Sequence, residues 1–104
     1  MRNNYQFREV KTKGRSYKTR DFWMQGFLNA EQISPVIGIV ATRKLGQAVQ
    51  RNRAKRIVRE IFRKNINNIN PKLSLIVLPR SSIFNLSFTT LEQKFIHGLE
   101  KISF

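Results

Sequence analysis

Residues 50–64 read QRNRAKRIVREIFRK, and the spacing of apolar side chains in this stretch decides the fold. They recur at i, i+3, i+4, i+7 and i+8, which is the spacing of one face of an α-helix: Ala54, Ile57, Val58, Ile61 and Phe62. Short apolar, β-branched runs lie on either side, at residues 35–41 and 73–78. Such runs, bounded by proline, are typical of buried strands. The sequence therefore predicts a β-α-β unit.

A further strand is predicted at residues 21–28. Alternation along a strand places successive side chains on opposite faces, so Phe22, Met24 and Leu28 share one face, and the other face carries Asp21, Trp23, Gln25 and Phe27. This second, mixed face fits either a half-covered core or a platform on which unpaired bases stack. The residues alone leave both interpretations open.

Both ends of the chain predict helices. Residues 4–13 fit a short helix that ends at Gly14. The sequence TTLE at residues 89–92 matches a capping box and predicts the start of a C-terminal helix. One side of that helix then carries Leu91, Phe95, Leu99 and Ile102. His97 falls on the opposite side, where an exposed position is expected.

Composition restricts the chemistry that this chain can perform. Its 104 residues suit a single small domain, and its formal net charge is +14. Without cysteine and with one histidine it cannot build a thiolate zinc site or an imidazole metal cluster. Its six acidic residues are scattered singly, which does not suit a two-metal nuclease. We therefore expect no catalytic residues and no metal site, but a protein that binds a polyanion.

Nucleic acid is the favoured polyanion. No run of about 18 apolar residues is present, so neither a membrane span nor a signal peptide is expected, and a cytoplasmic location follows as the default. The charge is also patterned, because residues 43–64 hold nine basic residues and one acidic residue, whereas residues 21–42 hold no basic residue. Such clustering of basic residues is typical of proteins that bind nucleic acid.

The predicted helix carries a row of like charges beside its apolar face. Arg51, Lys55, Arg59 and Arg63 follow one another at i, i+4 spacing, with Asn52 and Arg56 on the same polar flank. Each like-charge pair costs a few tenths of a kcal/mol in an isolated helix. The row is either a solvated surface or a phosphate-binding face. We favour phosphate binding, since arginine outnumbers lysine and compensating glutamate is nearly absent.

Residues 44–59, KLGQAVQRNRAKRIVR, match the pattern K-x-G-x-A-V-x-R-N-R-x-K-R-x-x-R. In this pattern, and in length and charge, the chain resembles the bacterial ribonuclease P protein component. The resemblance implies an α+β fold, with residues 1–104 forming one RNA-binding domain of element order αβββαβα. It also implies one central sheet with a left-handed β-α-β crossover, whereas general rules of chain connection favour a right-handed one.

The resemblance also implies a function. Members of this family join a catalytic RNA that removes the 5′ leader from precursor tRNA, with hydrolysis performed by Mg²⁺ held on the RNA. The expected partners are therefore the ribonuclease P RNA and precursor tRNA, with no membrane, no DNA and no cofactor bound by the protein itself. The residues implied to contact the RNA subunit are Arg43, Lys44, Arg51, Asn52, Arg53, Lys55, Arg56 and Arg59.

A second implied site is a cleft between the first helix and the sheet, which holds the single-stranded leader. Its residues by resemblance are Phe7, Lys11, Trp23, Gln25, Val40 and Thr42. Lys11 stands where many relatives have a second aromatic residue, and Gln25 where a tyrosine is common. In this chain, therefore, either Trp23 takes over the stacking of the missing aromatic residues, or contact with the leader depends more on charge than in those relatives.

Three other functions share some of these features. A ribosomal or other structural RNA-binding protein shares the size and charge but has no reason for the pattern at residues 51–59. A DNA-binding regulator could use residues 51–63 as a recognition helix. A free-standing nuclease would cleave RNA without any partner.

Overall fold

The computed structural model describes residues 15–102, and this part of the chain contains a mixed sheet of four strands. The strands are β1 (Arg15–Lys18), β2 (Phe22–Leu28), β3 (Val36–Ile39) and β4 (Leu73–Pro79). Their order across the sheet is β1-β2-β4-β3. β2 pairs antiparallel with both β1 and β4, whereas β3 runs parallel to β4. The predicted helix at residues 4–13 lies outside the described residues.

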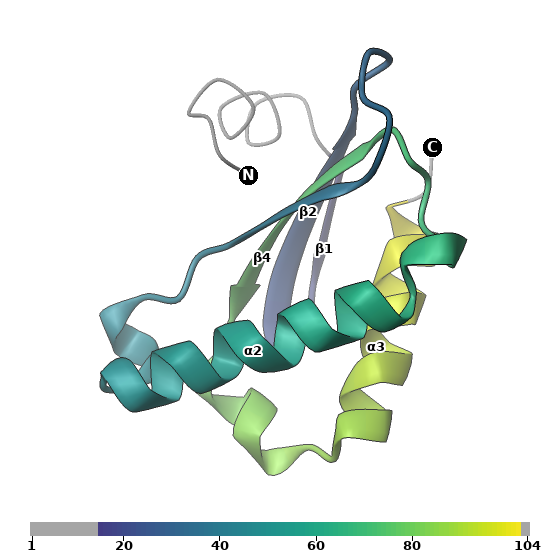
Figure 1. The fold of residues 1–104 in the computed structure, drawn as a ribbon. Coiled ribbons are helices and arrows are strands. Elements are labelled where there is room, and N and C mark those ends of the chain that lie inside the picture. Colours follow the sequence, from purple (N-terminus) through teal and green to yellow (C-terminus); the bar gives the residue numbers. More distant parts are fainter. Residues whose placement is uncertain (1–14, 103–104) are drawn as a thin grey trace.

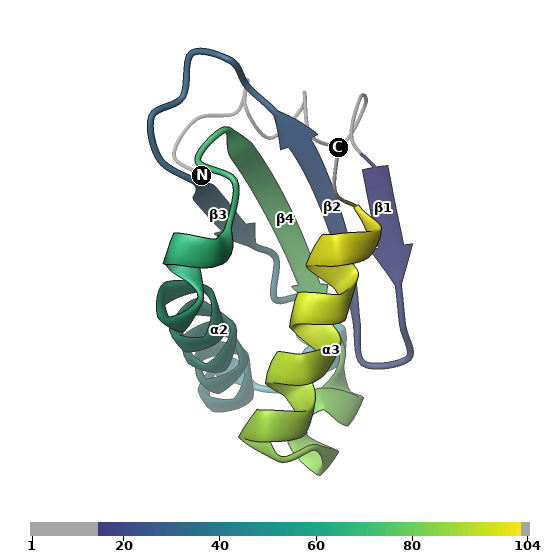
Figure 2. The ribbon, with the colours of Figure 1, turned by 90° about the vertical axis from the view of Figure 1, so that its right-hand side faces the viewer.

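Two α-helices cover one face of this sheet. They are α2 (Ala48–Lys64) and α3 (Phe88–Lys101), and Figure 2 shows both in front of the strands. Because α2 connects the parallel neighbours β3 and β4, the predicted β-α-β unit is confirmed. Three short 3₁₀ turns join the elements: η1 (Arg43–Leu45), η2 (Ile66–Asn68) and η3 (Ser81–Asn85). None of the helices in the described part is long and apolar enough to span a membrane.

The core lies between the sheet and the two helices (Figure 1). From α2 it takes Ala54, Val58, Ile61 and Phe62, which are four of the five residues that the periodicity placed on the apolar face. Ile57, the fifth, is half-buried against this core. Full burial of one such large side chain contributes about 1.5–3 kcal/mol relative to exposure. The apolar face of α2 therefore fixes which side of this helix remains in water.

The strand register assigns side chains to the two faces of the sheet. On the helix-covered face, Met24 and Val77 are directly opposite each other and both are buried. On the other face, Ser16 of β1 pairs with Gln25 of β2, and Gln25 pairs with Ile76 of β4. The alternation predicted for residues 21–28 is thus confirmed within β2. Asp21, which precedes the strand, was placed on the wrong face, because its carboxylate bonds to Lys94 of α3.

The starts of both helices differ from prediction, whereas α2 ends at Lys64 as predicted. α2 begins at Ala48, two residues early, because Gln47 and Gln50 form a reciprocal capping box. Glutamine is not among the usual cap residues, so residues 47–50 contain no clear sign of this start. The capping box predicted for residues 89–92 is wrong. Ser87 caps α3 instead, and its Oγ accepts a hydrogen bond from the Thr90 N–H at 3.2 Å.

Candidate nucleic-acid interface

The exposed side of α2 carries most of the residues assigned to RNA binding. Opposite the buried face lie Asn52, Arg56, Arg59 and Arg63, all exposed, while Arg51 and Lys55 are half-buried beside the core. Several of these side chains line a shallow groove of about 470 Å³. We call this surface the basic face: Arg51, Asn52, Lys55, Arg56, Arg59 and Arg63.

The basic face keeps its charge free for a partner. Within residues 15–102, ion pairs are formed by other cations: Lys94 and Arg20 pair with Asp21, and Lys64 pairs with Glu92. One acidic residue, Glu60, lies beside the arginines in the groove. Guanidinium groups bind phosphate oxygens through paired N–H donors and lose little hydration in doing so. This arrangement therefore suits contact with an RNA backbone.

Arg53 lies at the edge of the basic face, on the side of α2 toward η3. Its guanidinium carbon is 5.4 Å from the centre of the Phe84 ring, which belongs to η3. Sequence reasoning missed this contact, because the two residues are far apart in the chain and no motif connects them. The structure thus places one of the assigned arginines on an aromatic ring rather than in the groove.

Arg43 and Lys44 are exposed in η1, directly before α2. The connection to the helix depends on Gly46, whose φ of 138° and ψ of −161° lie in a region that only glycine adopts freely. The backbone N–H of Gln47 then donates to Oε1 of Gln50 at 2.9 Å. η1 is thereby attached to the first turn of α2, so its two cations continue the positive charge of the helix.

The sheet face without helices α2 and α3 carries the other set of assigned residues. Trp23 and Gln25 share this face. The Val40 N–H donates to the Val77 carbonyl at 2.9 Å, which continues the parallel ladder and places Val40 beside Leu78, the partner of Trp23. Thr42 follows two residues later, exposed. We call these four residues the leader face. Phe7 and Lys11, assigned to the same site, lie outside the described residues.

Trp23 and Gln25 are more covered than an open stacking platform would be. Trp23 is half-buried, its indole Nε1–H is buried without a hydrogen-bond partner, and Gln25 is 7% exposed. A buried indole N–H normally has a hydrogen-bond partner. Trp23 therefore presents a buried donor without a partner on this face.

Two of the acidic residues are held in structural contacts. Asp21 is fully buried, and its Oδ2 accepts a hydrogen bond from Lys94 Nζ at 2.7 Å. This bond, more than any other contact, lowers the pKa of the Asp21 carboxyl below 3.8, against the effect of burial. Hydrogen bonds from Asn65 and Lys64 likewise lower the pKa of Glu92. No group of three His, Cys, Asp or Glu side chains in residues 15–102 could hold a metal ion.

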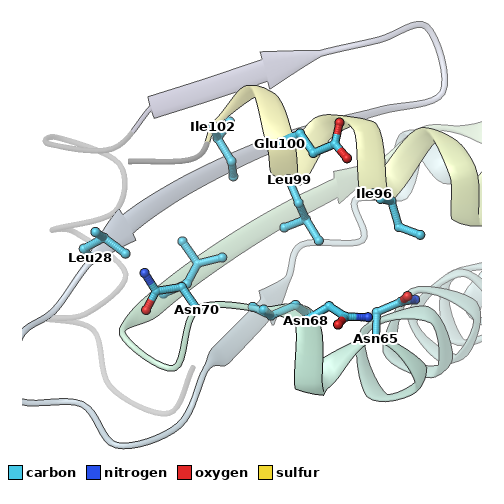
Figure 3. A pocket seen from close by; sticks show the side chains of 10 residues that line it. Leu28, Asn65, Asn68, Asn70, Ile96, Leu99, Glu100 and Ile102 are labelled. Atoms are coloured by element: carbon cyan, nitrogen blue, oxygen red, sulfur yellow. The ribbon is translucent and has the colours of Figure 1, made fainter.

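A separate pocket of about 440 Å³ lies between α3 and the connection from α2 to β4 (Figure 3). Leu99 points from α3 toward this connection, and Asn68 lies across from it. None of the lining residues is basic: Leu28, Asn65, Asn68, Ile69, Asn70, Leu73, Ile96, Leu99, Glu100 and Ile102. The pocket therefore suits phosphate groups less well than the basic face does.

Comparison with known proteins identifies the family. The model of the family described as Ribonuclease P matches residues 1–103, almost the entire chain. The chain belongs to the ribonuclease P protein family. The resemblance seen at residues 44–59 is thereby confirmed. The alternative assignment, a ribosomal or other structural RNA-binding protein, is set aside.

Similar proteins of the ribonuclease P protein family cover nearly the same length. The ribonuclease P protein component of Finegoldia magna is 31% identical over 103 residues, which span 99% of this chain and 89% of that protein. The one from Natranaerobius thermophilus is 34% identical over 104 residues, which span 97% of this chain and 87% of that protein. The chain is thus similar to these proteins along almost all of its length.

Solved structures of ribonuclease P proteins share the fold. The protein from Thermotoga maritima has a TM-score of 0.87 at 30% identity, covering 100% of this chain and 97% of that one. The protein from Staphylococcus aureus has a TM-score of 0.85 at 28% identity, covering 99% and 94%. The small α+β domain with a four-stranded mixed sheet is therefore the ribonuclease P protein fold.

Membership of the ribonuclease P protein family defines the function of the chain. It is the protein component of ribonuclease P, the endoribonuclease that processes the 5′ ends of tRNA. Its partner is the ribonuclease P RNA. The arginines of the basic face, which form no ion pair within residues 15–102, are consistent with this partnership.

Proposed function

We propose that the basic face of α2, with Arg43, Lys44 and Arg53, binds the ribonuclease P RNA. The leader face, with Phe7 and Lys11, binds the 5′ leader of precursor tRNA. The protein thereby reduces repulsion between two RNAs and holds the leader next to the catalytic RNA. It raises affinity for the precursor over mature tRNA and lowers the Mg²⁺ concentration that the reaction requires.

The observation that carries this proposal is the free charge of the basic face. Cations at i, i+4 spacing repel one another, and within residues 15–102 no carboxylate pairs with those of the basic face. The helix bears this cost while its other side supplies much of the core. A polyanion bound along the exposed side removes the repulsion, which explains why the charge is placed there.

Hydrolysis itself is assigned to the RNA subunit with its Mg²⁺. Asp21 is buried against Lys94, and Glu92 is bonded to Asn65 and Lys64, so both serve the fold. The protein contributes binding and orientation, and on its own it leaves precursor tRNA uncut. Because its substrate is a tRNA transcript, the protein acts in the cytoplasm.

We also propose two finer features of the fold that the family resemblance implies. Residues 1–104 act as a single domain, and the crossover from β3 through α2 to β4 is left-handed. An experimental structure of the complete chain tests both. A right-handed crossover would contradict the second feature.

Charge reversal tests the binding of the RNA subunit. We expect the double variant Arg56→Glu, Arg59→Glu to lose affinity for ribonuclease P RNA and to stop stimulating precursor cleavage at low Mg²⁺. The matched control is Lys72→Glu, Lys101→Glu, which changes the net charge equally at two exposed lysines outside α2. Equal losses in both variants, or no loss in either, would contradict the assignment of the basic face.

Precursors with leaders of different length test the leader face. We expect Trp23→Leu in the reconstituted holoenzyme to weaken binding of a precursor with a long leader by about 5- to 100-fold, the range of base–aromatic stacking. Affinity for a precursor whose leader is trimmed to one nucleotide should stay unchanged, which provides the internal control. A loss of the same size with both substrates would indicate damage to the fold instead.

A further inference from the structure

Arg53 projects from α2 in a different direction from the other assigned arginines. At 100° per residue it lies about 200° around the helix from Arg51 and about 60° from Arg56. This flank faces η3, and the Arg53 guanidinium lies over the ring of Phe84. Arg53 is exposed while Phe84 is half-buried, so the ring supports a charge that remains accessible to solvent.

A guanidinium over an aromatic face is held in orientation without losing its hydrogen-bonding capacity. The ring attracts the cation, whereas the five N–H donors lie in the guanidinium plane and point outward from its edge. A free arginine side chain loses rotamer freedom when it binds a phosphate, and a side chain already oriented by a ring loses less. Phe84 therefore lowers the entropy cost of an RNA contact made by Arg53.

The turn that carries Phe84 is itself firmly attached. Ile83 is 2% exposed. The Ser82 hydroxyl donates to the Arg20 carbonyl at 3.0 Å, and the Arg80 N–H donates to the Asp21 carbonyl at 2.9 Å. The ion pair between buried Asp21 and Lys94 fixes the same corner to α3. These contacts hold η3 against the sheet, so the position of the Phe84 ring is set by the core.

We propose that Phe84 is a positioning residue for RNA binding. It orients Arg53 so that the RNA-binding surface of α2 continues around the helix toward η3. The RNA subunit then meets cations on two sides of the exposed half of the helix, with Asn52 and Arg56 between them. This inference rests on the proposed binding of the ribonuclease P RNA by α2.

The chain contains a matched control for this contact. At the other end of α2, Lys64 Nζ lies 5.5 Å from the centre of the Phe88 ring. Phe88 is half-buried like Phe84, but Lys64 also forms an ion pair with Glu92 at 3.3 Å and is not among the residues assigned to RNA binding. Replacing either phenylalanine by leucine removes an aromatic face beneath a cation and keeps an apolar side chain.

The test measures the dissociation constant of the full chain for the ribonuclease P RNA of its source organism. We expect Phe84→Leu to weaken binding about two- to fivefold, the range of an exposed cation–π contact. Phe84→Tyr retains a ring and should bind like wild type, and Phe88→Leu should leave binding unchanged. In an Arg53→Ala background, Phe84→Leu should have no further effect. Thermal unfolding of each variant identifies any general loss of structure.

The outcomes separate this inference from the proposed function. Equal weakening by Phe84→Leu in the wild-type and Arg53→Ala backgrounds would overturn the positioning role, because a merely structural effect does not depend on Arg53. Wild-type binding by Phe84→Leu would overturn it as well. Failure of the proposed function has a different signature, namely no loss of affinity for the Arg56→Glu, Arg59→Glu variant.

Discussion

The carboxylate of Asp21 shows how one residue connects three elements. Asp21 lies just before β2 and is fully buried. Its carboxylate accepts a hydrogen bond from Lys94 of α3, and its backbone carbonyl accepts one from the Arg80 N–H, beside η3. Burying a carboxylate is costly unless it is paired and hydrogen-bonded. Lys94 supplies that pairing, so removal of the charge should weaken the corner where these elements meet.

We expect Asp21→Asn to lower the free energy of unfolding by about 1.5–3 kcal/mol at pH 7, the range for hydrogen bonds to charged groups. The pKa of Asp21 is lowered in the folded state, so its stabilising contribution is present above its usual value of 3.8 and is lost as the pH falls through the folded pKa. The difference between variant and wild type in urea unfolding should therefore shrink in acid. Glu31→Gln, at an exposed residue, is the control. A difference that does not change with pH would contradict this role.

Gly46 sets the direction in which the chain enters α2. Its backbone conformation is open to glycine and strained for other residues, and an added Cβ would lie 3.1 Å from the Gln50 Cβ. We expect Gly46→Ala to lower the free energy of unfolding by about 1–3 kcal/mol. It should also weaken RNA binding, because Arg43 and Lys44 change direction relative to the basic face. Urea unfolding and RNA titration measure the two effects, and a variant as stable as wild type would refute this account.

At the scale of elements, α3 approaches the sheet very closely at Gly98. A Cβ there would lie 2.8 Å from Met24 Sδ and 2.9 Å from Tyr17 Cδ2, so the helix rests directly on β1 and β2. Alanine favours a helix over glycine by about 1 kcal/mol. Overpacking of a core costs about 1–3 kcal/mol. The clash should therefore exceed the gain in helix propensity.

We expect Gly98→Ala to unfold at a lower urea concentration than wild type. Gln93→Ala, at an exposed position of the same helix, should unfold at the wild-type concentration or slightly above it. A Gly98→Ala protein more stable than wild type would show that Met24 and Tyr17 move aside at little cost. In that case the close approach of α3 would not be a constraint on the fold.

Elements with a strong period were predictable, but the starts of the helices were not. The spacing of Ala54, Val58 and Ile61 predicted α2, and alternation predicted the faces of β2, because both patterns follow from the geometry of a single element. The cap of α3 at Ser87 was missed, since Thr89 offered an equally good local signal. β1 was expected from the family resemblance alone, because four residues, RSYK, contain too little alternation to predict a strand.

The candidate site was likewise predictable only where its residues lie on a single element. The basic face lies on one helix, so its residues could be grouped from sequence, whereas the position of Val40 beside Leu78 depends on the pairing of β3 with β4. The contact of Arg53 with Phe84 also depends on how η3 packs, which no local pattern encodes. Contacts between distant segments are set by the whole fold, and these were not predictable.

At the scale of the whole molecule, the net charge is +14, and the cations differ in whether they form ion pairs. Lys94 and Lys64 neutralise acidic residues near the core, whereas no cation of the basic face forms an ion pair within residues 15–102. Under the proposed function, RNA binds these cations and counterions are released from its phosphates, and this release makes affinity depend on salt. The number of phosphates neutralised can therefore be measured without a structure of the complex.

If about six lysines and arginines neutralise phosphates, the logarithm of the binding constant should fall with the logarithm of salt concentration with a slope of about −4 to −5. Each phosphate contact that is removed should reduce the slope by about 1. We therefore expect Arg56→Ala, Arg59→Ala to give about −2 to −3, while Lys101→Ala, at an exposed residue of α3, keeps the wild-type slope. Filter-binding titrations of ribonuclease P RNA from 50 to 400 mM salt, run with all three proteins, give these slopes. A wild-type slope near −1 would mean that the arginines of α2 do not face the RNA backbone.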